Sequence, residues 1–220
     1  MEWLDRAALL MPRVISVCIR GVGRLNFPNS MFSCASLENL ELCVFPGGRT
    51  TIRPISIALP SLKTLKLHFL ILDDDFAQKL FLGCPSLKSL NLESCELFMS
   101  DISSNVLKKL TFGDCWQYNH MRICCPSLVS LSIQSNMFRT RTISLEKMTS
   151  VVKANISLYR TDEEEDVNDL PDAKLFSGLS NATSLKLHFG RHPDLKEQWE
   201  KDIPKCRTFK NLKSLEIAGL

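Results

Sequence analysis

Histidine and cysteine are the side chains of this sequence that could hold a metal ion or act as nucleophiles. The chain has nine cysteines with no Cys-x-x-Cys pair, and its four histidines are His68, His120, His188 and His192. A zinc site needs three or four converging nitrogen or sulfur ligands. His68 and His188 stand in two distant copies of the segment Leu-Lys-Leu-His-Phe, so we expect them not to share a ligand. The sequence therefore predicts no metal site.

Motifs for catalysis are equally scarce. The chain has no Gly-rich phosphate loop, no nucleophile elbow and no His-Glu-x-x-His pair, and its many serines fall mostly at variable positions of a repeated segment. No set of side chains meets the geometric requirements of a nucleophile with its base. We therefore predict no catalytic residue, no cofactor and no enzymatic activity.

A repeated segment must position these residues. Its strongest copy is Cys84-Pro-Ser-Leu-Lys-Ser-Leu-Asn-Leu92, and close relatives begin at Cys34, Leu59, Cys125 and Phe209. All share the pattern apolar-x-x-apolar-x-apolar, which is the strand segment of a leucine-rich repeat. With weaker copies included, nine units begin at Val14, Leu37, Leu62, Leu87, Leu107, Leu128, Val151, Ala182 and Leu212. In the first unit we place the three apolar sites at Val14, Val17 and Ile19.

The repeat determines the expected fold. The second and third apolar sites are two residues apart, so both point to one face of a short strand, and stacked units bury these faces in a continuous core. We expect an α/β leucine-rich-repeat solenoid, with a curved parallel sheet on the concave side and helices and irregular segments on the convex side. Helices are predicted at residues 73–83, 172–178 and 193–201, from acidic or proline starts and terminating glycines.

Domain organisation follows from the same spacing. Residues 1–220 should form a single domain of about nine units. Residues 1–12 are expected to form a linker or capping helix. The acidic run Asp162-Glu-Glu-Glu-Asp166 predicts a solvated loop insertion at residues 160–172, and a docking site for a basic partner is the alternative.

Most cysteines fall at shared repeat positions. Cys34, Cys84 and Cys125 precede the first repeat leucine, while Cys95 and Cys115 follow the third apolar site, as Asn136 does. Shared positions indicate shared packing, because free cysteine behaves as a small buried hydrophobe. At the Asn/Cys position such a side chain can bond to backbone groups of the turn that leaves the strand. We expect a reduced protein in the cytoplasm, the nucleus or both.

Outward strand positions are where a repeat solenoid would meet a partner. Two rows of such positions follow from the register, and they are mixed in charge with no aromatic anchors. The candidate partner-binding residues are Arg20, Glu41, Lys66, His68, Asn91, Glu93, Ser132, Gln134, Asn155, Lys186 and His188. The net charge is only +3, and no apolar stretch is long enough to span a bilayer, so we expect neither nucleic acid nor membrane as a partner.

The repeats, together with the opening segment Trp3-Leu-Asp-Arg-Ala-Ala-Leu-Leu-Met-Pro-Arg-Val, resemble those of plant F-box/leucine-rich-repeat proteins. The resemblance covers nearly the whole chain. It implies that a tryptophan-bearing helix leads into the first strand. It also implies a role as substrate receptor of a cullin-type ubiquitin ligase, in which an F-box binds a Skp-type adaptor and the repeats hold the target. The F-box itself is absent from this sequence, so the adaptor and cullin are expected partners only if an F-box lies upstream.

The sequence thus predicts a non-catalytic protein-interaction module. Our main interpretation is the target-recognition repeat region of an F-box-type ubiquitin ligase receptor, with an unknown protein target. A stand-alone repeat scaffold protein is one alternative. The other is a small-ligand receptor of the hormone-sensing type, with a polar pocket near Arg20, Lys66 and His68.

Overall fold

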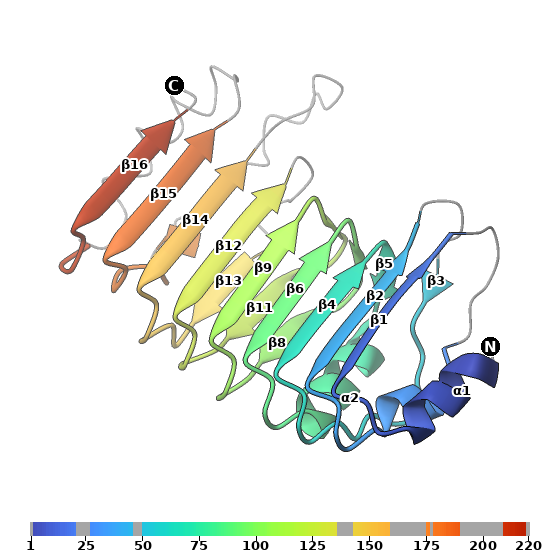
Figure 1. Cartoon of the computed structure of the whole chain (residues 1–220). Coiled ribbons are helices and arrows are strands. Elements are labelled where there is room, and N and C mark those ends of the chain that lie inside the picture. Colours follow the sequence, from blue (N-terminus) through green and yellow to red (C-terminus); the bar gives the residue numbers. More distant parts are fainter. Residues whose placement is uncertain are drawn as a thin grey trace.

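A parallel sheet of nine strands, in the order of the sequence, forms one layer of the protein (Figure 1). The computed structural model describes residues 2–20, 27–45, 50–135, 143–158, 175–176, 178–189 and 209–218. The strands are β1 (Val14–Ile19), β2 (Asn39–Val44), β4 (Thr64–His68), β6 (Ser89–Glu93), β9 (Lys109–Gly113), β12 (Ser130–Ser135), β14 (Lys153–Leu158), β15 (Ser184–Phe189) and β16 (Ser214–Ala218). Each predicted unit contributes one strand. The leucine-rich-repeat fold is confirmed.

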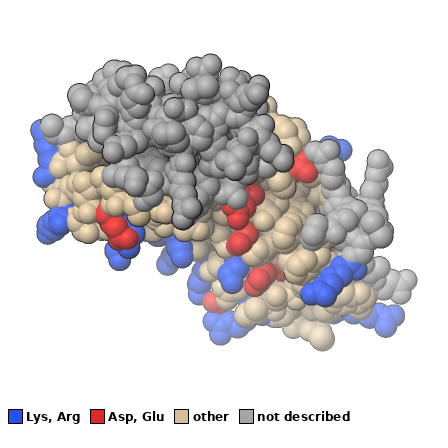
Figure 2. Space-filling view, turned by 90° about the horizontal axis from the view of Figure 1, so that it is seen from above, with Lys and Arg blue, Asp and Glu red and all other residues tan. Residues whose placement is uncertain are grey.

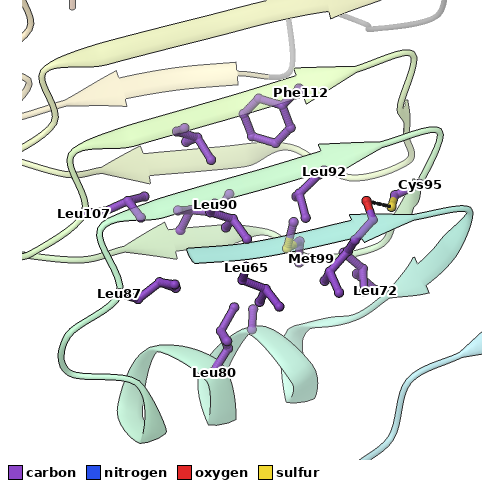
Figure 3. Packing of buried hydrophobic residues seen from close by; sticks show 14 of the residues in the cluster. Leu65, Leu72, Leu80, Leu87, Leu90, Leu92, Cys95, Met99, Leu107 and Phe112 are labelled. Carbon is purple, nitrogen blue, oxygen red and sulfur yellow. Dashed lines mark hydrogen bonds between the residues drawn. The ribbon is translucent and has the colours of Figure 1, made fainter. Parts of the chain in front are cut away.

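The core lies behind this sheet and is built by the three apolar sites of each unit. Leu87, Leu90 and Leu92 are all buried, and Leu90 pairs in register with Leu65 on one side and Leu110 on the other. Figure 3 shows Leu65, Leu87, Leu90 and Leu92 on the inner side of the strands, with Leu80 reaching them from a helix behind. Identical side chains thus pack against their counterparts in the next unit, and each strand is stabilised by its neighbours.

The first unit is the exception to the predicted register. Ile15 pairs with Leu40 and Val17 with Leu42, so Ile15 and Val17 are the buried second and third sites. Val14, which we had placed at the first site, has 60% of its surface exposed, and Ile19 is only partly buried. Our assignment of Val14, Val17 and Ile19 was therefore wrong by two residues. A two-residue shift keeps the same face inward, because side chains alternate along a strand.

Short strands form a second layer, which the sequence did not reveal. One further sheet contains β3 (Thr50–Thr51), β5 (Leu70–Leu72), β7 (Glu96–Leu97) and β10 (Trp116–Gln117), and another contains β8 (Asp101–Ser103), β11 (Met121–Cys124) and β13 (Ile143–Glu146). Directly after β4, β6 and β9 the chain turns, at Phe69, Ser94 and Asp114 respectively. All three residues adopt positive φ angles of 47–58°. These equivalent turns redirect the chain from the large sheet into β5, β7 and β10.

Two α-helices and one 3₁₀-helix precede and accompany the first strands. They are α1 (Glu2–Leu9), α2 (Asp74–Gly83) and η1 (Asn29–Phe32). The predicted helix at 73–83 is confirmed, and the Asp73 carboxylate caps it by accepting a hydrogen bond from the Phe76 amide at 3.0 Å. None of the described helices is long and apolar enough to cross a membrane.

α2 ends in a glycine because its last residue lies against the backbone of the preceding unit, where a side chain would not fit. A Cβ atom built at Gly83 would lie 2.0 Å from the Ile57 carbonyl oxygen, a distance that no side chain can adopt. Gly178 stands at the equivalent position of a later unit, and a Cβ there would lie 2.3 Å from the Leu145 Cβ. Of the predicted helix at 172–178, Leu175 and Phe176 are helical and buried. The predicted helix at 193–201 and the acidic loop at 160–172 lie outside the described residues.

The repeat cysteines are packing residues, as expected. Cys34, Cys84, Cys95, Cys115 and Cys125 are all buried. The Cys95 thiol shares its proton between the Leu67 and Glu93 carbonyls, both at 3.4 Å. Figure 3 shows one of these two hydrogen bonds. Cys115 repeats this arrangement one unit later. These thiols pair carbonyl groups that the strand-exit turns leave in the interior. Asn136, the third residue at this position, lies outside the described residues.

Candidate protein-interaction surface

The outward side of the nine-stranded sheet, here called the sheet face, carries the candidate residues. Strand pairing places one row of side chains in continuous register across it, namely Ser16, Glu41, Lys66, Asn91, Thr111, Ser132, Asn155, Lys186 and Glu216. A second row follows two residues later, namely Cys18, Cys43, His68, Glu93, Gly113, Gln134, Ser157, His188 and Ala218. Ten of the eleven candidates lie in these rows.

Arg20 is the one candidate whose predicted position was wrong. We expected it in the second row, but the corrected register of β1 gives that place to Cys18. Arg20 instead follows the end of β1, at the edge of the sheet. Its guanidinium carbon lies 4.9 Å from the centre of the Phe45 ring, which is the geometry of a cation–π contact.

Charged candidates gather on the first half of the sheet. Lys66 Nζ lies 3.5 Å from Glu41 Oε2. His68 lies between two carboxylates, with Nε2 at 3.7 Å from Glu41 Oε1 and Nδ1 at 3.8 Å from Glu93 Oε2. These distances are too long for hydrogen bonds. The four side chains therefore form a charged group whose hydrogen-bonding capacity is only partly used.

Two polar atoms in this part of the sheet face are buried without a hydrogen-bond partner. They are His68 Nε2, on β4, and Asn91 Oδ1, on the adjacent β6. A buried polar atom that stays unpaired costs about 1–3 kcal/mol of stability, so such atoms are rare in folded proteins. Both atoms lie beneath the surface of the sheet face, so a partner would reach them only after the side chains turn outward.

The remaining candidates lie on the second half of the sheet face, on β12, β14 and β15. Ser132, Gln134 and Asn155 are uncharged neighbours on β12 and β14. Further along, Lys186 Nζ pairs with Glu216 Oε2 at 2.5 Å. His188 is in the same row as His68, but β6, β9, β12 and β14 separate them, as the sequence indicated.

An aromatic group lies next to the charged candidates, and the sequence did not lead us to it. The rings of Phe45 and Phe69 are stacked, with centres 5.7 Å apart, and Arg20 covers Phe45. We call these three residues the rim cluster, because each directly follows a strand of the large sheet. Phe69 holds a φ angle of 58°, which is costly for a bulky residue. The only available signal was the phenylalanine that follows His68 in the repeated Leu-Lys-Leu-His-Phe segment.

At the opposite edge of the sheet, where strands begin, one carboxylate is paired with two basic side chains. Glu38 accepts hydrogen bonds from Lys63 Nζ at 2.7 Å and from Arg13 Nε at 2.8 Å. These two contacts hold the pKa of Glu38 below its ordinary value, with Lys63 the larger cause. This edge joins three successive units and leaves its acidic group satisfied.

The wider surface gives little support to other kinds of site. Basic side chains follow one margin of the described surface, and acidic side chains lie mostly inward of them (Figure 2). The described residues contain no cluster of three potential metal ligands. A cavity of about 10 Å³, enough for about one water, lies in the core among Leu40, Leu62 and Phe76 and not beside His68. The acidic run at 162–166 lies outside the described residues.

Comparison with known proteins places the repeats in a family. The family model "FBD-associated F-box protein At5g56370, LRR repeats" matches residues 2–123. The FBD-associated F-box protein At4g13985 of Arabidopsis thaliana is 33% identical over 166 residues, covering 70% of this chain and 34% of that protein. F-box/LRR-repeat protein 13 of the same plant is 36% identical over 74 residues, which are 33% of this chain and 16% of that protein.

The chain spans about a third of the length of the curated relatives that it matches over most of its own length. No solved structure matches it. The family model covers more than half of the 220 residues, from the start of α1 into β11. The chain therefore belongs to the FBD-associated F-box protein family, of which it carries leucine-rich repeats.

Proposed function

We propose that this chain is the target-recognition repeat region of an F-box-type ubiquitin ligase receptor, and that the first half of its sheet face binds a protein target. The observation that carries the proposal is the adjacency of the rim cluster to the charged group of Glu41, Lys66, His68 and Glu93. Family membership supports the ligase connection, because the matched relatives are named as F-box proteins.

A protein partner suits this surface better than other classes. Aromatic residues and arginine are the side chains most often responsible for binding energy at protein interfaces, and a surrounding polar rim excludes water from them. Arg20 and the two phenylalanines supply such anchors, and the charged group of Glu41, Lys66, His68 and Glu93 supplies the polar surround. A nucleic acid would favour a basic stripe.

The repeats do no chemistry in this proposal. They hold the target while a Skp-type adaptor and a cullin, engaged through an F-box, bring the ubiquitin-transferring machinery. The place of action is the cytoplasm, the nucleus or both. The stand-alone scaffold alternative shares the same binding surface and differs only in lacking the adaptor.

Proximity labelling in plant cells with a proteasome inhibitor tests the binding surface. The unmodified chain is compared with a variant that carries Phe45→Ala, Phe69→Ala and His68→Ala, and with the control Leu82→Ala on the exposed side of α2. We expect one set of proteins to be labelled by the unmodified chain and the control and lost with the triple variant, provided that all three proteins melt alike. Equal labelling by all three would contradict the proposal.

The ligase connection needs a separate experiment. The protein expressed from its own gene, with whatever sequence the gene encodes upstream, should co-purify with a Skp-type adaptor. A target captured through the sheet face should then accumulate when the gene is deleted. Capture of a target without the adaptor would favour the stand-alone scaffold.

A further inference from the structure

Two cysteines face each other across the first two strands of the sheet. Cys18 of β1 and Cys43 of β2 are register partners, one residue beyond the buried pair Val17 and Leu42. Because side chains alternate along a strand, both thiols point to the sheet face and away from the core. Cys18 is exposed and Cys43 is partly exposed.

The two thiols are close enough to bond. Neighbouring strands of a sheet lie about 4.8 Å apart, and the Cα atoms of a disulfide are usually about 4.4–6.8 Å apart. The Cys18 thiol is also close enough to contribute to the raised pKa of Cys43. A disulfide between them would therefore form without separating β1 from β2.

A second neighbouring pair in the same protein shows what burial does to such thiols. Cys95 and Cys115 also interact with each other, but both are completely buried and donate hydrogen bonds to carbonyl groups. Burial and the neighbouring Cys95 raise the pKa of Cys115 well above its ordinary value. An oxidant in solution does not reach a completely buried thiol, whichever way its pKa is shifted. Accessibility therefore separates the two pairs.

We propose that Cys18 and Cys43 are a reversible oxidation site that reacts with small disulfides such as oxidised glutathione and closes as an intramolecular disulfide. The Cys18 thiolate attacks one glutathione sulfur, which breaks the glutathione disulfide, forms a mixed disulfide on Cys18 and releases one glutathione thiolate. Cys43 then loses its proton to water and attacks the Cys18 sulfur. This second step forms the Cys18–Cys43 bond and releases the second glutathione, so the two protein thiols give two electrons to one glutathione disulfide.

The surroundings of Cys43 support this order of events. Burial, followed by the hydrogen bond to Cys18, raises the pKa of Cys43 to about 11. Cys43 thus stays protonated while Cys18 meets the oxidant. Once Cys18 is in the mixed disulfide, it no longer raises the pKa of Cys43. Burial and the Glu41 carboxylate still oppose ionisation, and the Arg20 guanidinium favours it. The site stands on the strand register and does not depend on the proposed function.

Peptide mapping under non-reducing conditions tests the proposal. The folded chain is treated with oxidised glutathione, quenched by alkylation and digested with trypsin. Cleavage after arginine isolates Cys18 in the peptide of residues 14–20, whereas Cys43 falls with Cys34 in the peptide of residues 25–49. We expect these two peptides to be linked, two hydrogens lighter than their sum, with fragment ions that assign the bond to Cys43. Reduced glutathione should reverse the link.

Two variants act as controls. Cys43→Ser should stop the reaction at the mixed disulfide, leaving one glutathione on Cys18. Cys124→Ser should leave the link unchanged, because the register partners of Cys124 are Ser103 and Glu146. The proposal is overturned if the unmodified chain carries only glutathione adducts, if the bond falls on Cys34, if the link joins two separate chains or if neither thiol reacts.

Discussion

Replacing Leu90 with alanine should measure how much one inward leucine contributes to the stacked core. Leu90 is 2% exposed and lies between Leu65 and Leu110, which are equally buried on the two adjacent strands. Removal of such a side chain costs the transfer free energy of the lost carbons and a further amount for the cavity, together about 2.7–5.0 kcal/mol in well-packed cores. The two flanking strands are fixed by their own ladders, so we expect a loss of about 3–5 kcal/mol in the free energy of unfolding.

Urea titration followed by circular dichroism provides the assay, and Leu82→Ala provides the matched control. Leu82 is the same residue type on the neighbouring helix α2, but 77% of it is exposed. Its replacement should change the free energy of unfolding by no more than about 0.5 kcal/mol. If the two variants unfold at the same urea concentration, Leu90 does not face the core and the register that underlies the sheet face is incorrect.

Three further predictions concern local features of the same units. Gly83→Ala should lower the free energy of unfolding by about 1–3 kcal/mol, because its Cβ would overlap a backbone oxygen. Gly113→Ala is the control and should be nearly neutral, because its Cβ would lie at an ordinary 3.5 Å from the nearest neighbour. Thermal melting compares the two variants. Asp73→Ala should cost about 1 kcal/mol by removing the cap of α2, measured by urea titration. Burial raises the pKa of Cys84 to about 12, so the native state keeps a proton that the unfolded state loses above about pH 9. Stability should therefore fall as the pH rises from about 9 to 12, and urea midpoints should show a shallower fall for Cys84→Ala.

The sequence predicted the large sheet well because a repeat supplies the same evidence many times. The units that begin at Leu37, Leu62, Leu87 and Leu128 carry three leucines or isoleucines at fixed spacing, and their strands begin two residues after the first of these. The first unit has apolar residues at 14, 15, 17 and 19, so the pattern alone fits two registers. Pairing with β2 selects one of them, and that information is not local to the unit.

The second layer and the rim cluster could not be predicted from the repeat pattern, because neither produces a periodic signal in the sequence. Strands of two or three residues, such as β7 and β10, are too short to show a periodic pattern. The position of Phe69 depends on a positive φ angle at a bulky residue, which composition does not suggest. The stacking of Phe45 on Phe69 then follows from the exits of two strands that meet only in the folded sheet.

Recognition by this protein should be unevenly distributed along the solenoid. The inward residues of every unit are alike because each must pack against the next, so they carry no information about a partner. The outward residues are free to differ, and the first four strands concentrate the rim cluster, the charged group and the unpaired atoms of His68 and Asn91. Over β12 and β14 the two outward rows hold only uncharged side chains, Ser132, Gln134, Asn155 and Ser157. Under the proposed function, substitutions at Ser132 or Asn155 should therefore change target binding less than substitutions at Phe69 or His68, a comparison that binding assays with the captured target would make directly.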